Sequence, residues 1–349
     1  MRPVLTIGVE EEFLLLTADG AVSPTAAAAV RHARLPEQIK PEYMAYQLET
    51  STRVCETLDE LRRDLTRLRL IAADAAERDG ALLVATGSAP LDGGPRQALT
   101  DDARYRDLAR RFPDATAAGG TCGCHVHVGV PDRELATAVL TRLRPWLGAL
   151  LSLAVNSPYS GAADTGWASS RYPAQLRWPT CRPPGVWPSA DRYDAAVRDH
   201  VDAGMATDAA SVYFWARLSP RYPTIEVRIG DTGLDVADSV LLAGVVRALV
   251  AALLDDVRRG EKIVPVASAR VEADLELAAR GRLGHGRRLL EKITPYLAGD
   301  VGEVYAGFER LRREGTGADR QRRLWARHSG GAGFVRWLAH ATTPLAVAY

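Results

Sequence analysis

Three short segments contain side chains whose types and spacing could support chemistry, and the first is acidic. The segment TIGVEEEF, which ends at Phe13, is typical of a β-strand because β-branched and apolar residues dominate it. Alternate residues of a strand point to the same side, so Glu10 and Glu12 share one face. Like charges at this spacing repel one another unless a cation lies between them, and divalent cations prefer carboxylate oxygens. The pair therefore indicates either a metal site or a solvated sheet edge with incidental glutamates.

The second segment, TIEVRIG, pairs an acid with an arginine. Strand alternation puts Glu226 and Arg228 on one face and the apolar residues between them on the other. The commoner reason for such a pair is a simple ion pair on an exposed sheet. The planar guanidinium group also fits the oxygens of phosphate or carboxylate groups. Glu42 and Glu49, beside a strand expected at 43–54, add acidic candidates of the same kind.

The third segment, TCGCHVHVGV, contains two cysteines and two histidines within six positions, which suggests zinc. Zinc requires ligands that converge tetrahedrally on one point. Strand alternation instead puts His125 and His127 on one face and Cys122 and Cys124 on the other. No second cluster of Cys or His completes a ligand set, so we expect the cysteines to be small buried hydrophobic residues. A metal-dependent amidohydrolase that uses the His-x-His strand stays open as a weaker alternative.

The composition limits the classes of partner. The chain has 349 residues, of which 47% are hydrophobic and 25% charged, and its formal net charge is +1. This balance, without a long run of one sign, makes nucleic acid a poor partner. The sequence contains no GxxxxGK[ST] loop, and no GxGxxG follows a strand. Any phosphate would therefore be bound by arginine, metal ions or backbone N–H groups.

The cysteines and the apolar runs give an expectation for location. The first residues lack the basic region and apolar core of a signal peptide. The most apolar later run, 241–254, contains Arg247 and is too short to span a bilayer. Four cysteines in a chain of this length do not form a disulfide framework. We therefore expect a cytoplasmic protein that binds no membrane.

Hydrophobic periodicity predicts strands interspersed with helices, followed by a helical tail. Strands are expected at 4–16, 43–54, 81–86, 121–130, 211–218 and 224–229. Helices are expected at 57–78, at 131–153 with a kink at Pro145, at 237–259 and throughout 268–340. The stretch 156–187 is expected to be a functional loop, because its three tryptophans argue against disorder. This order predicts an α+β fold.

Five segments together resemble the bacterial carboxylate–amine ligases, also called type 2 glutamate–cysteine ligases. They are GVEEEF at 8–13, QLETSTRVCET at 47–57, TCGCHVHVGV at 121–130, NSPYSG with DTGWASSR at 156–171, and TIEVRIGDT at 224–232. The resemblance implies an ATP-dependent enzyme that phosphorylates a carboxylate, typically the γ-carboxylate of glutamate. An amine then displaces phosphate from the acyl phosphate, which leaves an amide.

The resemblance also implies a fold like that of glutamine synthetase. The sheet would be curved and mostly antiparallel, forming a half-open funnel or half-barrel with helices packed on its outer face. Residues 1–349 would form a single catalytic domain, in which 261–349 is a mainly helical C-terminal segment. The partners would be a small-molecule acid and an amine, and a homodimer is expected.

The same resemblance implies a set of metal-binding acids. Glu10 and Glu12 match the first acidic pair, which holds Mg²⁺ at the ATP phosphates. Glu49 matches a second metal-binding acid, and Glu226 matches the acid of the late strand, with a catalytic role as well. Several carboxylates that face one cavity suit two or more Mg²⁺ ions, which also screen the triphosphate charge.

Further residues are implied to contact the substrates. Arg228 matches an arginine that acts on the transferred phosphoryl group and contacts ATP, and His125 matches a catalytic histidine near substrate and nucleotide. Substrate binding is implied for Arg171, which matches the arginine for the acceptor acid. His127, as a weaker neighbour of His125, and Glu42 are expected to bind substrate too.

Two segments depart from the family pattern. Relatives carry a segment resembling E-N-x-W-x-A-x-R-Y-G-L near the nucleotide, and this chain has RVEADLELAARGRLGHGRR instead. Arg280, with the arginines that follow it, could replace lost phosphate contacts, although a solvated helix surface is the commoner reason for such arginines. The loop after Arg171 reads PTCRPPG where relatives tend to have P-R-x-G. These departures leave a non-catalytic relative that binds an amino acid or nucleotide as a second hypothesis.

Overall fold

The computed structural model describes residues 4–91, 93–284, 286–328 and 330–343, which form a main sheet covered by helices and a separate two-stranded hairpin. The strands are β1 (Ile7–Leu16), β2 (Ile39–Pro41), β3 (Gln47–Ser51), β4 (Leu82–Val84), β5 (Gly123–Gly129), β6 (Tyr159–Ser160), β7 (Ala163–Asp164), β8 (Ala216–Leu218) and β9 (Thr224–Asp231). The first helices are α1 (Ala26–Ala33), α2 (Leu58–Glu77), α3 (Ala103–Arg111), α4 (Pro113–Ala117), α5 (Arg133–Leu143), α6 (Leu147–Leu153), α7 (Arg171–Gln175) and α8 (Ala190–Asp202). The later helices are α9 (Val236–Arg258), α10 (Ser268–Ala279), α11 (Arg287–Ile293), α12 (Val301–Glu314), α13 (Gly317–His328) and α14 (Gly331–Thr342).

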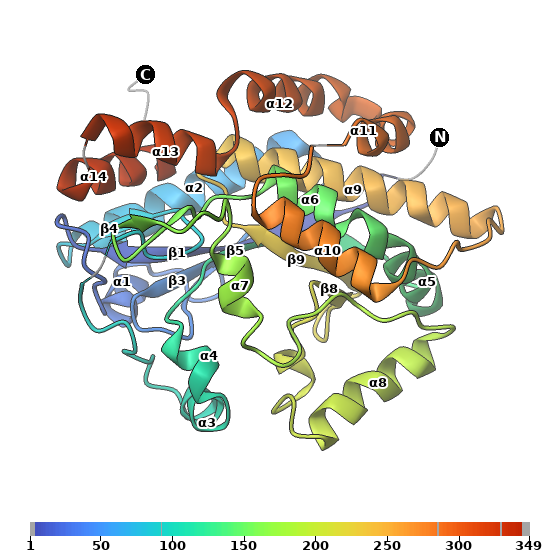
Figure 1. The fold of residues 1–349 in the computed structure, drawn as a ribbon, viewed down its shortest axis with the longest axis horizontal. Coiled ribbons are helices and arrows are strands. Elements are labelled where there is room, and N and C mark those ends of the chain that lie inside the picture. Colours follow the sequence, from blue (N-terminus) through green and yellow to red (C-terminus); the bar gives the residue numbers. More distant parts are fainter. Residues whose placement is uncertain (1–3, 92, 285, 329, 344–349) are drawn as a thin grey trace.

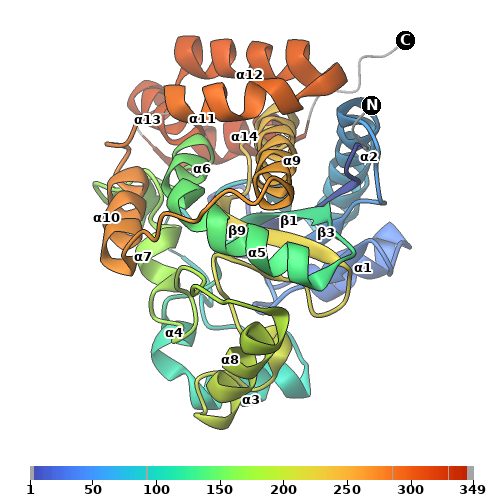
Figure 2. The ribbon, with the colours of Figure 1, turned by 90° about the vertical axis from the view of Figure 1, so that its right-hand side faces the viewer.

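The main sheet is open and its described pairings are antiparallel. Its strand order is β2-β3-β1-β5-β9-β8, and β4 also pairs with β1. Figures 1 and 2 show α9 and α6 above the sheet, with α11 and α12 as a further layer. The helices α3, α4 and α8 lie on the opposite side. The α+β fold class with an open antiparallel sheet is therefore confirmed.

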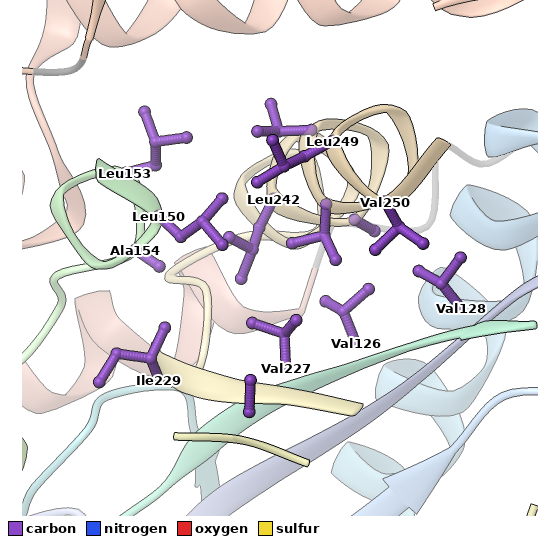
Figure 3. Close-up of a cluster of buried hydrophobic side chains, with 14 of the residues drawn as sticks. Val126, Val128, Leu150, Leu153, Ala154, Val227, Ile229, Leu242, Leu249 and Val250 are labelled. Carbon is purple, nitrogen blue, oxygen red and sulfur yellow. The ribbon is translucent and has the colours of Figure 1, made fainter. Parts of the chain in front are cut away.

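The main core fills the space between the sheet and the helices above it. Buried apolar residues of β5 and β9 meet buried residues of α6 and α9, as Figure 3 shows for Val126, Val227, Leu150 and Leu242. Because strand residues alternate, this packing fixes which face of β5 and β9 points away from the helices. Packing of the core therefore determines which side chains of β5 and β9 lie on the opposite face of the sheet.

An ion pair inside this apolar layer fastens the first strand. Glu11 and Arg69 of α2 are both fully buried, and the Nη2 and Nε atoms of Arg69 donate to the two carboxylate oxygens at 2.6 and 2.9 Å. Arg69 also donates to the carbonyl oxygens of Gly233, at 2.9 Å, and Thr342, at 3.1 Å. Glu11 thus points to the helix side, which leaves its neighbours on β1 to face the other way.

Most predicted elements are found with shifted ends, and several strands are much shorter than predicted; of the strand predicted at 43–54, only Gln47–Ser51 forms. The predicted break in the helix at Pro145 is confirmed, because a 3₁₀ turn (Arg144–Trp146) separates α5 from α6. The strand predicted at 211–218 is wrong for its first half: Ala209–Ser211 forms a 3₁₀ turn capped by Asp208, and only Ala216–Leu218 pairs with β9. The loop predicted at 156–187 contains the short hairpin β6–β7 and helix α7.

The apolar helix α9 satisfies the length and composition of a membrane span but lies inside the protein. In its most apolar 18-residue window, 83% of the residues are buried. A helix that is hydrophobic on all sides and covered in this way is typical of a protein core.

Candidate functional site

The face of the sheet opposite the main core carries a two-dimensional array of charged side chains. Antiparallel register sets residues of neighbouring strands opposite each other. The opposed pairs are Lys40 with Glu49, Glu49 with Glu12, Glu10 with His125, His127 with Glu226, and Glu226 with Arg217. The two expected faces of β5 are confirmed at Cys124, which is buried in the main core, and at His125, which faces Glu10.

Three of these side chains could hold a metal ion. Within the described residues, ligand atoms of Glu10, His127 and Glu226 all lie within 4.8 Å of one another. The Nδ1 atom of His127 is 2.9 Å from the Thr224 hydroxyl, which fixes the ring, while Nε2 is buried and has no hydrogen-bond partner in the described chain. A buried ring nitrogen without a partner is costly, and binding of a cation at this point would satisfy it. We call these three residues the ligand triad.

Two arginines orient the carboxylate of Glu226. Arg217 Nε donates to one oxygen at 2.8 Å and its Nη2 donates to the other at 3.2 Å. Arg228 pairs with the same carboxylate. Burial alone would favour the protonated acid, but the charges of Arg228 and Arg217 outweigh burial and lower the pKa of Glu226. The side chain is therefore an anion in a fixed orientation.

His125 lies between the acids of β1 and Arg228. Its Nδ1 atom is 3.3 Å from a carboxylate oxygen of Glu10 and 3.4 Å from Arg228 Nη1. Its Nε2 atom is 3.8 Å from Glu12. Burial, with the charge of Arg228, lowers the pKa of His125, so the ring is neutral at pH 7 and can accept a hydrogen bond.

Glu49 and Glu42 are the two acids of the array whose pKa values are raised. Burial and the negative charges of Glu10, Glu42 and Glu12 raise the pKa of Glu49 well above its usual range, and Lys40 opposes this only in part. Burial and the charge of Glu12 raise the pKa of Glu42 to about 7. Shifts of this direction arise where carboxyl groups are buried close to one another, and a bound cation would oppose them.

The array lies along three adjoining cavities. The central pocket, about 210 Å³, contains the ligand triad together with Glu12, Glu42, Glu49 and Arg228. The inner pocket, about 90 Å³, shares Glu12, Glu42 and Arg228 with it and adds Arg171 and aromatic walls. An apolar groove of about 650 Å³ adjoins the other end; its members are Val4, Leu5, Thr6, Ile7, Gly8, Val9, Glu10, Ser51, Thr52, Arg53, Val54, His127, Gly129, Pro131, Tyr222, Pro223 and Thr224.

Arg171 is the cation at the closed end of the inner pocket. It is buried, and its Nη1 and Nη2 atoms donate to the carbonyl oxygens of Ile229 and Arg228, both at 3.1 Å. Its Nε atom has no hydrogen-bond partner in the part of the chain that is described. The guanidinium group is thus anchored by β9, and its positive charge lies at the wall of the inner pocket.

The structure brings together all but one of the residues predicted for the site. Arg280, predicted to contact the nucleotide, instead bonds to Glu276 at 2.9 Å and lies 3.9 Å from the centre of the Trp167 ring. Among the described residues, it lines none of the three cavities. The reason is the chain's path: α10 packs on α6 and contributes to the main core, away from the residues of the charged array.

Sequence reasoning missed several residues of the site. Arg217, Lys40, Arg104 and Tyr105 line the central pocket, and the Tyr105 hydroxyl is 3.4 Å from Glu42. A signal existed for two of them. Arg217 is a lone charge between apolar residues of a predicted strand, and Lys40 is one of only three lysines in the chain. Arg104 and Tyr105 lie on α3, whose position relative to the sheet no local pattern reveals.

Comparisons with known proteins agree with this geometry. The family model described as "Glutamate-cysteine ligase family 2 (GCS2)" matches residues 6–331. A protein of Salinispora tropica named "Putative glutamate–cysteine ligase 2" is 42% identical over 93% of this chain and 91% of its own length. A protein of Mycolicibacterium vanbaalenii named "Putative glutamate–cysteine ligase 2-2" is 41% identical over 94% of this chain and 95% of its own.

A solved structure shows the same fold. The crystal structure of glutamate–cysteine ligase from Francisella tularensis in complex with AMP superposes with a TM-score of 0.73, covering 99% of this chain and 90% of that chain. Its sequence identity is 15%, so the likeness concerns the fold alone.

Proposed function

The chain belongs to glutamate–cysteine ligase family 2, and from this membership we propose that it joins the γ-carboxylate of glutamate to an amine. Membership makes it an ATP-dependent ligase that forms an amide bond. The identity of the acid, the acyl-phosphate route and the use of Mg²⁺ are our proposal. The observation that carries it is the position of the ligand triad. It lies on the same sheet face as Glu12, Glu49 and Arg228, between the inner pocket and the apolar groove.

The three cavities give each substrate a place. We assign the acid to the inner pocket, where Arg171 binds a carboxylate, and the triphosphate to the central pocket. The apolar groove is assigned to the adenine ring, because Val54 and Tyr222 are exposed there and offer apolar surface next to the ligand triad. The reacting carboxylate and the γ-phosphate then meet near Arg228, which lines both polar pockets.

The residues present fit divalent cations. The ligand triad offers two carboxylates and one imidazole nitrogen, and Glu12 and Glu49 add oxygen donors in the same pocket. Carboxylate oxygens suit Mg²⁺ and Mn²⁺, and they make up most of the donors in this pocket. When bound, such ions screen the charge of the triphosphate and of the transferred phosphoryl group.

The chain's own residues then act by position and charge. A carboxylate oxygen of the acid attacks the γ-phosphorus of ATP, and ADP leaves with the bonding electrons. The amine attacks the acyl carbon, phosphate leaves, and the amine nitrogen loses a proton. Contacts with Glu226 and His125 fix the guanidinium group of Arg228 where the inner and central pockets meet. There it stabilises the phosphoryl oxygens.

The test is release of ADP that requires both an acid and an amine. Purified protein with ATP and Mg²⁺ is given glutamate with cysteine, then a panel of other acids and amines. Glu226→Gln is expected to lower kcat on the order of 100-fold, because it removes a charged ligand at the phosphoryl junction. Glu77→Gln, an exposed position at the end of α2, is the matched control and should leave the rate unchanged.

Two outcomes would contradict the proposal. Absence of ADP release with every pairing would refute ligase activity on these substrates. Wild-type protein that binds ATP without any turnover, and still binds ATP after Glu226→Gln, would instead favour the non-catalytic relative. We also propose that the reaction takes place in the cytoplasm, since all four cysteines are free and buried, and that the enzyme is a homodimer.

A further inference from the structure

Several polar residues of the family segments lie outside the charged array. They come from NSPYSG, from DTGWASSR and from the end of TIEVRIGDT, and they meet behind the inner pocket. Their common partner is Asp231, the last residue of β9, whose side chain is fully buried. Burying a carboxylate costs free energy unless hydrogen bonds satisfy it, so the partners of Asp231 indicate its role.

Asp231 accepts hydrogen bonds from two loop segments. The Ser157 hydroxyl donates to one carboxylate oxygen at 2.7 Å, and the Asn156 N–H donates to the same oxygen at 2.8 Å. The Ser169 hydroxyl donates to the other oxygen at 2.7 Å. These bonds tie the end of β9 to both ends of the loop that begins at Asn156 and leads into α7.

We call the hydrogen bonds that Asp231 accepts from Asn156, Ser157 and Ser169 the bracket. Arg171 is the first residue of α7 and follows Ser169 by two positions. Its backbone N–H lies 3.3 Å from the Ser157 hydroxyl, which itself bonds to Asp231. Its Nη1 atom is 4.0 Å from Asp231 Oδ1, close enough for attraction but too far for a hydrogen bond. Asp231 thus offsets the burial of the guanidinium charge without occupying its donors.

Two glycines provide the space for this arrangement. A Cβ atom at Gly87 would lie 2.7 Å from Asp231 Cγ, and a Cβ atom at Gly123 would lie 2.4 Å from Arg171 Nη2. Such distances are shorter than any contact between carbon and a neighbouring heavy atom that a packed protein tolerates. Glycine at both positions therefore allows the backbone to approach the two charged groups where they lie.

We propose that Asp231 is a positioning residue that sets Arg171 in the inner pocket and thereby determines the affinity for the acid substrate. The inference rests on the proposed function, because it takes the inner pocket as the site of the acid. The geometry follows from β9. Glu226 and Arg228 lie in the middle of this strand, and Asp231 at its end holds the loop that leads into Arg171. One strand therefore sets the distance between the group that binds the acid and the group that acts on the phosphoryl transfer.

The variant that tests this is Asp231→Asn, which keeps the volume and one acceptor oxygen. The amide N–H₂ group now faces a donor, so the serine hydroxyls must rotate and the loop must shift. We expect KM for glutamate to rise on the order of tenfold, while KM for ATP stays within about twofold, because the loop carries Arg171 and not the ligand triad. Asp256→Asn is the matched control, since Asp256 is a buried carboxylate bonded to Lys292 and Arg259 at the far end of α9.

A double-mutant cycle separates positioning from general stability. If Asp231 acts through Arg171, then Asp231→Asn should add little to the KM for glutamate of Arg171→Gln. Multiplicative effects on KM, or a lowered melting temperature with both KM values unchanged, would overturn the proposal. If Asp231→Asn does not fold, Ser169→Ala removes one bond of the bracket and should change the same KM in the same direction.

Calorimetric titration of glutamate without ATP or amine keeps this test independent of turnover. Glutamate binding that weakens in Asp231→Asn supports the positioning role even if the amine is not yet identified. Glutamate binding that is equal in wild type and Asp231→Asn contradicts it, whatever the ligase assay shows. Failure of the ligase assay alone contradicts the proposed function.

Discussion

The titration of Glu42 can be used to measure the free-energy cost of placing several acids in one site. It lines both polar pockets, and burial with the neighbouring charge of Glu12 raises its pKa from 4.5 to about 7. Between these two values the folded protein keeps the proton that the unfolded chain releases. Stability from this group is therefore greatest below pH 4.5, falls as pH rises through the window, and is absent above pH 7.

The size of the effect follows from the shift. A rise of the pKa from 4.5 to about 7 corresponds to roughly 3 kcal/mol, most of which is lost between pH 5 and pH 8. Replacing Glu42 with Gln removes the titration. Relative to wild type, the free energy of unfolding of Glu42→Gln should therefore increase by about 2–3 kcal/mol between pH 5 and pH 8.

The assay is urea unfolding in the presence of EDTA at both pH values, followed by circular dichroism. Comparing the two proteins cancels the other groups that titrate over this range. Glu77→Gln, at an exposed helix position, should follow the wild-type pH dependence. The same Glu42→Gln protein should turn over more slowly at pH 8, which would show stability exchanged for function. An identical pH dependence in wild type and Glu42→Gln would refute the reasoning about burial and charge repulsion.

Two further predictions concern residues away from the pockets. Arg69→Met should lower the free energy of unfolding by about 3–5 kcal/mol, because it leaves the carboxylate of Glu11 buried without a partner. Thermal unfolding of the double variant Glu11→Leu/Arg69→Met should recover much of this loss, and additive losses would contradict the explanation. Arg280→Ala should change KM for ATP by less than about threefold, because Arg280 lies over Trp167 and bonds to Glu276 at a partly exposed position. A larger rise in KM for ATP would restore its predicted role at the nucleotide.

The sequence by itself determined which side chains share a face. The period of a strand is local, so alternation alone placed Glu10 with Glu12 and separated His125 from Cys124, and the structure has both arrangements. The strongly apolar run at 237–259 likewise predicted α9 within one residue at each end. These conclusions hold because they depend on neighbours in the chain and not on where the strands lie.

Only the tertiary structure decided which of these side chains meet. Register pairs residues far apart in sequence, so His127 joins Glu10 and Glu226, whereas Glu12 lies opposite Glu49. Arg280 has the charge of a phosphate ligand, but the helix that carries it packs away from the charged array. Strand order and helix docking follow from burial of the whole apolar surface, a global quantity that no local period encodes.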